Sequence, residues 1–331
     1  MFAAWYDRPG PAHEVLQVGK LPDPHPGAGE VRVRLSYSGI NPGDTKKRSD
    51  WMGFGLPFPR IIPHSDGAGV VDEIGRDVDP HLVGQRVWVF GAQSYRALGT
   101  AAQYTVIPAD RVVPLPDAVD SRLGACLGIP GITAHRAVFA DGPVRGRTVV
   151  VQGVLGAVGS LAAQLAHRAG AEVIGTVRRT SDLEAVRTVG NSPWLAHCIA
   201  LDQDPVAELR RVAPRGADRI IEVDLGGNAG VDAALAAPGA VVAAYATGPG
   251  TTEIPFWPML FGNLTLRFLG SDDFPAAERR RAVDDLSAAT AEGALRIPIA
   301  EPLPLERIAE AHDRVDAGSR SRVLLTFDQP S

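Results

Sequence analysis

Three glycines at a spacing of three follow an apolar segment in the middle of the chain. Residues 148–152 are mostly β-branched, as in a strand buried in a parallel sheet, and Gly153, Gly156 and Gly159 come directly after them. Apolar positions then continue from Ala157 at a helical spacing. Glycine lets the backbone approach a pyrophosphate closely, and the bare N–H groups at the start of a helix attract it. The segment therefore predicts a dinucleotide site.

The context of this turn makes the prediction more specific than the glycines alone would. Val154 replaces one glycine of the common G-x-G-x-x-G pattern, so the match is to a variant. A strand before the turn, a helix after it and a second strand at 172–177 complete a βαβ unit. We expect the turn to bind the cofactor through Gly153, Leu155, Gly156, Ala157, Val158 and Gly159.

The end of the second strand indicates which dinucleotide binds. Where NAD enzymes usually place an acidic side chain on the ribose, this chain has Thr176 followed by Arg178 and Arg179. A carboxylate would repel a 2′-phosphate, whereas a guanidinium can donate two hydrogen bonds to it. We therefore predict NADPH, bound in part by these three residues. The alternative is that both arginines merely solvate the start of a helix.

Strand and helix patterns around the turn predict an α/β chain of two domains. Residues 30–38 alternate between polar and apolar, and further short strands are predicted at 67–74, 85–90 and 102–107, typical of a small antiparallel barrel or sandwich. From about Ile129, strands alternate with helices, which predicts a doubly wound parallel sheet, the Rossmann arrangement. The six expected strands lie near Thr148, Glu172, His197, Asp218, Ala240 and Thr265.

The last third of the chain should complete these two domains. Helices are expected near 276–290 and 305–317, and a last strand at 322–327, all packing back on the first domain. Residues 265–270 are predicted to form the edge of the parallel sheet. Pairing of this edge with its twin would remove an exposed edge, so a homodimer is expected.

Composition excludes several classes of function. The 331 residues and 45% hydrophobic content suffice for two cores, and a net charge of −5 disfavours nucleic acid as a partner. Cys126 and Cys198 lie in apolar surroundings, as free thiols of a reducing compartment do. The start of the chain lacks the pattern of a signal peptide, and no apolar run approaches ~20 residues. We therefore expect a cytoplasmic protein without a membrane segment.

Five segments resemble a known family in order and rough spacing. They are residues 39–51, 62–75, 99–108, 127–139 and the glycine turn, and together they resemble the quinone oxidoreductase branch of the medium-chain dehydrogenase/reductases. Residues 218–228 look most like the zeta-crystallin subgroup. The resemblance implies a GroES-like catalytic domain at 1–127, completed by 271–331, and a Rossmann NADPH-binding domain at 128–270.

The resemblance also implies a reaction and further site residues. The reaction is the reduction of quinones or related electrophilic carbonyl compounds by hydride transfer from NADPH, in the cleft between the domains. Asn41 and Thr133 would lie beside the nicotinamide, where amide and hydroxyl groups can hold the ribose and carboxamide. The remaining cofactor contacts that it implies are Tyr245, Ala246, Thr247, Leu269, Gly270 and Arg320.

No metal is expected at the catalytic position. Two cysteines cannot form the four-cysteine zinc site of related alcohol dehydrogenases. Asn41, Ser65 and Pro130 stand where those enzymes carry their cysteine and histidine ligands of the catalytic zinc. His64 lies one position early, and a lone histidine without thiolate partners is more often a hydrogen-bonded side chain than a ligand.

The remaining candidates concern catalysis and the acceptor. Asn41 and Asp44 are candidate catalytic residues, although Asp44 could equally be a carboxylate that caps a turn. Lys46, Trp51 and Phe54 are expected at the acceptor, where the aromatic rings could stack on a flat molecule or simply anchor the loop. His135 is either a proton donor or a core residue, and we favour the core.

Two alternatives to quinone reduction remain open at this point. An alkenal or enoyl reductase of the same superfamily would add a hydride to a conjugated double bond and would need a proton donor. A low-turnover NADPH-binding protein, structural or RNA-binding as in some zeta-crystallins, belongs to a different class of function. The acidic charge balance disfavours the RNA-binding version.

Overall fold

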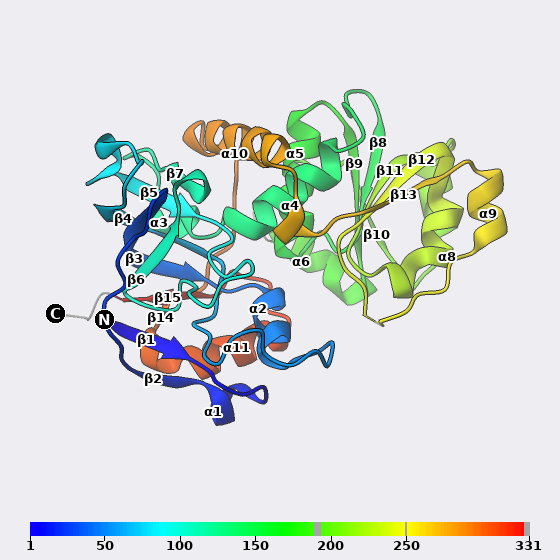
Figure 1. Ribbon diagram of the computed structural model, residues 1–331. Helices are drawn as coiled ribbons and strands as arrows, with labels where there is room; N and C mark the ends of the chain where they lie inside the picture. Colours follow the sequence, from blue (N-terminus) through cyan, green and yellow to red (C-terminus); the bar gives the residue numbers. More distant parts are fainter. Residues whose placement is uncertain (189–192, 249, 328–331) are drawn as a thin grey trace. The chain divides into compact units, whose positions relative to one another are not determined.

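The computed structural model describes residues 1–188, 193–248 and 250–327. It divides into two compact units, one formed by residues 1–130 together with 283–331 and the other by Gly131–Ala282. Figure 1 shows a β-rich unit and a unit built on a parallel sheet, so the predicted α/β fold class is confirmed. The domain boundaries expected at 127/128 and 270/271 stay predictions. Among the described residues, no helix has the length and apolar composition that a bilayer crossing requires.

A six-stranded parallel sheet forms the centre of the second unit. Its strand order is β10-β9-β8-β11-β12-β13. The order therefore reverses between β8 and β11, and β13 lies at one edge. Ligands of such sheets bind at the carboxyl ends of the strands, beside the point where the order reverses. All six predicted strands are present: β8 (Thr148–Val151), β9 (Glu172–Val177), β10 (His197–Ala200), β11 (Ala217–Glu222), β12 (Ala236–Ala244) and β13 (Thr265–Phe268).

Helices surround this sheet because each presents one apolar side to it. In α5 (Ala157–Arg168), Leu161 and Leu165 are buried, and the helix begins at the predicted residue. Val150 and Ile220, on neighbouring strands, lie at the centre of the core. The other helices of the second unit are α6 (Leu183–Thr188), α7 (Pro205–Val212), α8 (Leu225–Leu235) and α9 (Phe256–Phe261). Two more helices each cross a boundary between the two units: α4 (Gly128–Phe139) crosses the one after Pro130, and α10 (Ala276–Ala291) the one after Ala282.

The first unit is organised around the long strand β3 (Glu30–Gly39). This strand pairs antiparallel with β4 (Asp66–Ile74), β6 (Tyr104–Pro108) and β15 (Leu324–Thr326). The predicted strands at 30–38, 67–74, 85–90 and 102–107 are confirmed as β3, β4, β5 (Arg86–Val89) and β6. Four short strands were not predicted: β1 (Phe2–Trp5), β2 (Gln17–Lys20), β7 (Val112–Pro114) and β14 (Leu303–Pro304).

Short helices close the first unit around this sheet. The helix α11 (Ile308–Asp316), near the carboxyl end, packs against α1 (Ala12–Val15) and α2 (Pro42–Arg48). A further helix, α3 (Ser121–Gly124), contacts β3, β4 and β5.

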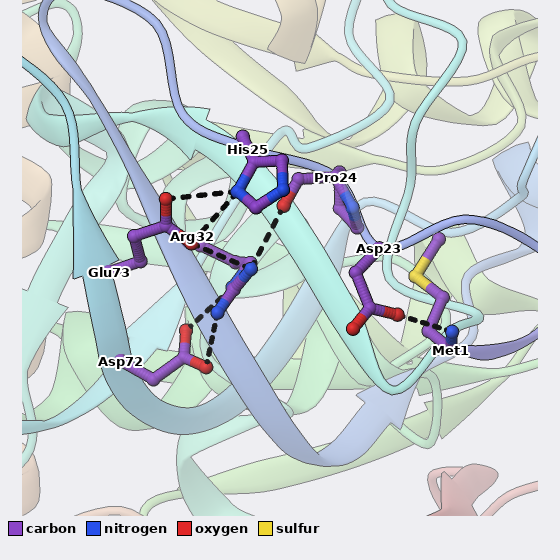
Figure 2. A network of polar contacts seen from close by, with 7 residues as sticks. All are labelled: Met1, Asp23, Pro24, His25, Arg32, Asp72 and Glu73. Carbon is purple, nitrogen blue, oxygen red and sulfur yellow. Dashed lines mark hydrogen bonds and ion pairs between the residues drawn. The ribbon is translucent and has the colours of Figure 1, made fainter.

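A polar network fixes the segment before β3 to the sheet (Figure 2). On β3, Arg32 donates to both carboxylate oxygens of Asp72 at 3.0 and 3.1 Å, and also to the carbonyl of Pro24 at 3.2 Å. His25 Nδ1 lies 3.0 Å from the carboxylate of Glu73. The proline-rich stretch after β2 is therefore held by side chains of β3 and β4 rather than by a strand ladder of its own.

A chain of buried side chains crosses the first unit through His64. Arg48 Nε donates to Nδ1 of His312 at 3.2 Å, and the two Nε2 atoms of His312 and His64 lie 2.9 Å apart. His64 Nδ1 lies 2.8 Å from the hydroxyl of Ser38, which also contacts Thr100 at 2.8 Å. Because Nδ1 of His312 accepts, its Nε2 must donate to His64, which in turn donates from Nδ1 to Ser38. Both imidazoles are therefore neutral.

Burial explains why neither ring carries a charge. Loss of hydration, with the neighbouring Arg48, lowers the pKa of His312 from its ordinary value of 6.5 to about 3. Burial likewise lowers the pKa of His64 well below that value. Because these pKa values are lower in the folded state, the pair stabilises the fold above pH 6.5. That stability is lost as the pH falls from 6.5 toward the folded pKa values.

We predict that the His64–His312 pair makes the fold acid-sensitive. Each histidine that titrates only on unfolding should reduce the free energy of unfolding by up to about 1.4 kcal/mol per pH unit below its unfolded pKa. Urea titrations between pH 7.5 and 5 measure this slope. His312→Gln, which cannot ionise, should flatten it, whereas His13→Gln on the exposed surface should not. An unchanged slope in His312→Gln would contradict the assignment.

Candidate functional site

The glycine turn joins β8 to α5, and each glycine has its own structural reason. Gly153 has a φ of +65°, which favours glycine. A Cβ on Gly159 would lie 2.4 Å from the carbonyl oxygen of Gly153, so Gly159 lets the helix pack onto the turn. Gly156 is the exposed N-cap of α5, and a Cβ there would meet only one atom, at 3.3 Å. The first N–H groups of α5 lack intrahelical acceptors and point out from this end.

Thr176 fixes the turn against the neighbouring strand β9. Its hydroxyl oxygen accepts from the N–H of Gly153 at 3.3 Å and donates to Gln152 Oε1 at 2.5 Å. Its carbonyl accepts from the N–H of Val154 at 3.0 Å. The side chain of Thr176 is fully buried. The hydroxyl of Thr176 is thus engaged within the protein, where it positions the turn, and a contact between this residue and the cofactor stays a prediction.

The two arginines after β9 are exposed, as a contact with a ligand phosphate requires. Arg178 and Arg179 have exposed side chains, and neither forms an ion pair with another residue in the described ranges. Asp202 lies close by, since its carboxylate accepts from the N–H of Thr180 at 3.0 Å and from its hydroxyl at 2.8 Å. These bonds lower the pKa of Asp202. An acid therefore does approach this end of β9, from the turn after β10.

The segments after β12 and β13 lie at the same edge of the sheet as the turn, because the strands are parallel. The carbonyl of Ala246 accepts from the N–H of Leu225 at 3.2 Å, which ties residues 245–247 to the start of α8. The hydroxyl of Thr247 accepts from the N–H of Gly226 at 3.1 Å. Tyr245 is half-buried. Two of the remaining predicted residues, Leu269 and Thr133, are buried, and Gly270 is exposed.

In the first unit, Asn41 is held between two carboxylates. Its Nδ2 donates to Asp66 at 2.7 Å, and its backbone N–H donates to Asp44 at 2.7 Å. The other oxygen of Asp66 accepts from the N–H of Ile129 at 2.9 Å, and a Cβ on Gly128 would lie 2.1 Å from that oxygen. Asp66 therefore fixes the orientation of the Asn41 amide, and sequence reasoning did not identify it in this role.

Asp44 has the capping contact that the sequence suggested, and its catalytic role stays a prediction. It caps the start of α2 through the Asn41 N–H, which is the capping role. Burial raises its pKa from 3.8 to about 7, and the bond from Asn41 offsets part of that rise. A buried carboxyl with such a pKa can hold or release a proton near neutral pH.

The donor set at the position of the catalytic zinc in related enzymes does not fit zinc. Asn41 offers an amide that already donates to Asp66, while Ser65 and Pro130 offer no thiolate or imidazole. Both ring nitrogens of His64 are used by Ser38 and His312. Within the described ranges, no group of three His, Cys, Asp or Glu residues is arranged to hold a metal ion.

Of the predicted acceptor residues, Lys46 lies in α2, and Trp51 and Phe54 lie on the exposed loop that follows it. The side chains of Trp51 and Phe54 are 49% and 81% exposed, and Lys46 Nζ lies 5.2 Å from the centroid of the Trp51 ring. The carboxylate of Asp50 accepts from the N–H groups of Phe54 at 2.9 Å and Gly55 at 3.1 Å. Asp50 therefore fixes the loop while its aromatic side chains remain accessible.

Two further predicted residues occupy different surroundings. His135 is buried in α4 with its ring centroid 4.7 Å from that of Phe139, as expected for a core residue. Arg320 lies in the exposed segment between α11 and β15, in the first unit.

Comparison with known proteins agrees with this arrangement. Residues 27–117 match the alcohol dehydrogenase GroES-like domain family, and residues 157–284 match the zinc-binding dehydrogenase family. The quinone oxidoreductase of Mus musculus is 29% identical over 298 residues, which cover 89% of this chain and 88% of the relative.

Two solved structures share the fold over nearly the whole chain. A mycobacterial protein complexed with NADPH has a TM-score of 0.83 and 23% identity, with 98% of this chain and 99% of that one covered. An NAD-dependent alcohol dehydrogenase has a TM-score of 0.84 and 25% identity, with 99% and 100% covered. Both cofactor types thus occur on this fold. The chain belongs to the medium-chain dehydrogenase/reductase superfamily, in its zeta-crystallin-like quinone oxidoreductase branch, and is an oxidoreductase.

Proposed function

We propose that this enzyme reduces quinones with NADPH and without a metal ion. The observation that carries the proposal is the neutral donor set of Asn41, Ser65 and Pro130 at the position of the catalytic zinc in related enzymes. An unactivated ketone needs a Lewis acid or a strong proton donor for the oxygen that becomes negative. A quinone does not, because conjugation stabilises its reduced form.

The residues of this chain would then bind and orient rather than activate. The cofactor supplies the hydride. The start of α5 would hold its pyrophosphate, and Arg178 and Arg179 its 2′-phosphate. Asn41, oriented by Asp66, would position the nicotinamide end, and the exposed rings of Trp51 and Phe54 would pack on a flat acceptor.

Turnover measurements test the proposal directly. We expect NADPH oxidation with a panel of quinones, undiminished after prolonged chelation, and little with aldehydes. Faster turnover of enals would instead assign the enzyme to conjugated double-bond reduction, for which Asp44 is a candidate proton donor. Tight NADPH binding without turnover of any acceptor would favour the low-turnover alternative. Loss of activity when bound zinc is removed, and recovery of activity when zinc is restored, would contradict a metal-free reaction.

Cofactor preference should depend on the two arginines after β9. Each guanidinium–phosphate contact is worth roughly 1.5–3 kcal/mol, so Arg178→Ala with Arg179→Ala should weaken NADPH about tenfold or more. NADH affinity should stay nearly constant, because NADH lacks the 2′-phosphate. Fluorescence titration with both cofactors measures this. The matched control is Arg211→Ala with Arg215→Ala, two exposed arginines elsewhere in the same unit. Equal affinity of the unaltered protein for NADH and NADPH would refute the assignment.

The glycine turn offers a test of where the pyrophosphate lies. Gly156 has ordinary backbone angles, φ −78° and ψ 162°, so a side chain there leaves the fold intact. Gly156→Asp places a negative charge at the start of α5 and should abolish NADPH binding. Gly156→Ala is the matched control and should weaken it much less. Tight binding by Gly156→Asp, with an unchanged circular dichroism spectrum, would place the cofactor elsewhere.

We also propose a homodimer formed through the edge strand β13. Four large aromatic side chains are exposed on β13 and the preceding α9, namely Phe256, Trp257, Phe261 and Phe268, at 56, 63, 75 and 72%. A second copy of the same edge would pair with β13 and cover this patch.

Cys126 and Cys198 are free thiols, which supports a reducing compartment such as the cytoplasm.

The dimer predicts a specific effect of charge at the edge. Phe268→Lys should give a particle of one chain mass, 34.9 kDa, in sedimentation equilibrium, because an unpaired ammonium group would be buried in the contact. The control Phe54→Lys, at an equally exposed ring of the first unit, should leave the oligomer unchanged. A single-chain mass for the unaltered protein at micromolar concentration would exclude the dimer.

A further inference from the structure

The hydrogen bonds that hold the glycine turn continue into the interior of the second unit. The Gly153 N–H donates to Thr176, whose hydroxyl donates to Gln152 Oε1. Gln152 Nε2 then donates to Asp232 Oδ1 at 2.8 Å. The side chains of Thr176, Gln152 and Asp232 are fully buried. In this chain, the amide of Gln152 presents its oxygen to the hydroxyl of Thr176 and its nitrogen to the carboxyl group of Asp232.

The chain ends on a pair of buried carboxyl groups. Glu222, the last residue of β11, is fully buried, and its carboxyl group interacts with that of Asp232 of α8. The other titratable groups that face the pair are Asp224, at the start of α8, and the half-buried Tyr245, after β12. Within the described ranges, neither acid forms an ion pair with a lysine or arginine. Two ionised carboxylates would therefore face each other without a compensating cation.

The donors around the pair show which acid is charged. Glu222 accepts from the Asp224 N–H and from Asn228 Nδ2 at 3.0 and 3.2 Å, as a carboxylate would. Oδ2 of Asp232 is enclosed, and no N–H or hydroxyl of the described chain reaches it. A bare carboxylate oxygen in that position would be unsatisfied. It is satisfied if Oδ2 itself carries the hydrogen and donates it to Glu222.

We infer that Glu222 and Asp232 share one proton, and that this proton positions the glycine turn through Gln152 and Thr176. The second part rests on the proposed binding of a dinucleotide at that turn. Loss of the proton would leave two adjacent buried anions, which repel each other. Asp232 would then move away from Glu222 and take Gln152 with it, so that Thr176 and the Gly153 N–H would lose their fixed places. A residue acting in this way is a positioning residue, since it does not touch the cofactor.

The energetics agree with this geometry. Burial, followed by the charge of Glu222, raises the pKa of Asp232 from 3.8 to about 9. The folded protein therefore keeps the proton at neutral pH. Because the folded pKa is raised, the stability that the proton contributes is complete below pH 3.8 and is lost progressively as the pH rises to about 9.

The test measures dinucleotide affinity against pH in the whole protein. For the unaltered chain, we expect Kd for NADPH to be constant from pH 7 to 8 and to rise about threefold to tenfold around pH 9, the effect of one lost hydrogen bond. Asp232→Asn, whose amide imitates the protonated acid, should bind as the unaltered chain does at pH 7 and show no step. NADH should give the same step as NADPH, because both share the pyrophosphate.

Two more variants separate the parts of the chain. Thr176→Val breaks the link to the turn, so its affinity should be lower at all pH values and should show no step. Glu222→Gln would set an amide donor against the donors of Asp224 and Asn228, so it should bind weakly even at pH 7. A step of equal size in Asp232→Asn would overturn the inference, as would its persistence in Thr176→Val.

The melting temperature, measured without ligand at several pH values, tests for the shared proton independently of cofactor binding. The melting temperature of the unaltered chain relative to Asp232→Asn should fall steadily from pH 5 to 9. A constant difference would overturn the shared proton. A falling difference together with no binding of NADPH or NADH at any pH would overturn the proposed cofactor and the link to the turn, while the shared proton would stand.

Discussion

The bond from the Gly153 N–H to the hydroxyl of Thr176 is a constraint on which the cofactor half of this enzyme depends. A turn with a left-handed glycine at its start has few internal bonds, and α5 can present its free N–H groups in one direction only if that turn is fixed. The adjacent strand β9 supplies the group that fixes the turn, which is the hydroxyl of Thr176 near the carboxyl end of the strand. Two parallel strands thus cooperate, one carrying the loop and the other holding it in place.

In the first unit, carboxylates rather than hydroxyls fix the position of a predicted site residue. Asn41 is oriented by Asp66 and capped by Asp44, and Gly128 leaves room for the Asp66 oxygen that binds the Ile129 N–H. Of these residues, Asn41 stands where the resemblance places a metal ligand in the related zinc enzymes. Here its amide donates to the carboxylate of Asp66 instead.

The parts that the sequence predicts well are those set by local pattern. Apolar runs identified all six strands of the parallel sheet, and the glycine spacing located the start of α5 at Ala157. Strands such as β1 and β7, only three or four residues long, carry too few positions for an alternation to be visible. Contacts between distant segments were also missed: nothing near Gln152 reveals that it meets Asp232, and Asp202 reaches Thr180 from the turn after β10. The sequence likewise does not show that the hydroxyl of Thr176 bonds to Gln152, which lies 24 residues away.

The backbone at His64 has one more consequence, which concerns how this protein can change. With a φ of +76°, position 64 has a conformation that costs a histidine more than it costs a glycine, and the ring compensates through its bonds to Ser38 and His312. Replacement by glycine would relax the backbone but leave the imidazole of His312 and the hydroxyl of Ser38 without their bonds to this ring. Loss of His312 alone would remove one of the two bonds that compensate for the strained backbone at His64. The two positions are therefore coupled over 248 residues of sequence, and substitutions at them should be tolerated together more readily than singly.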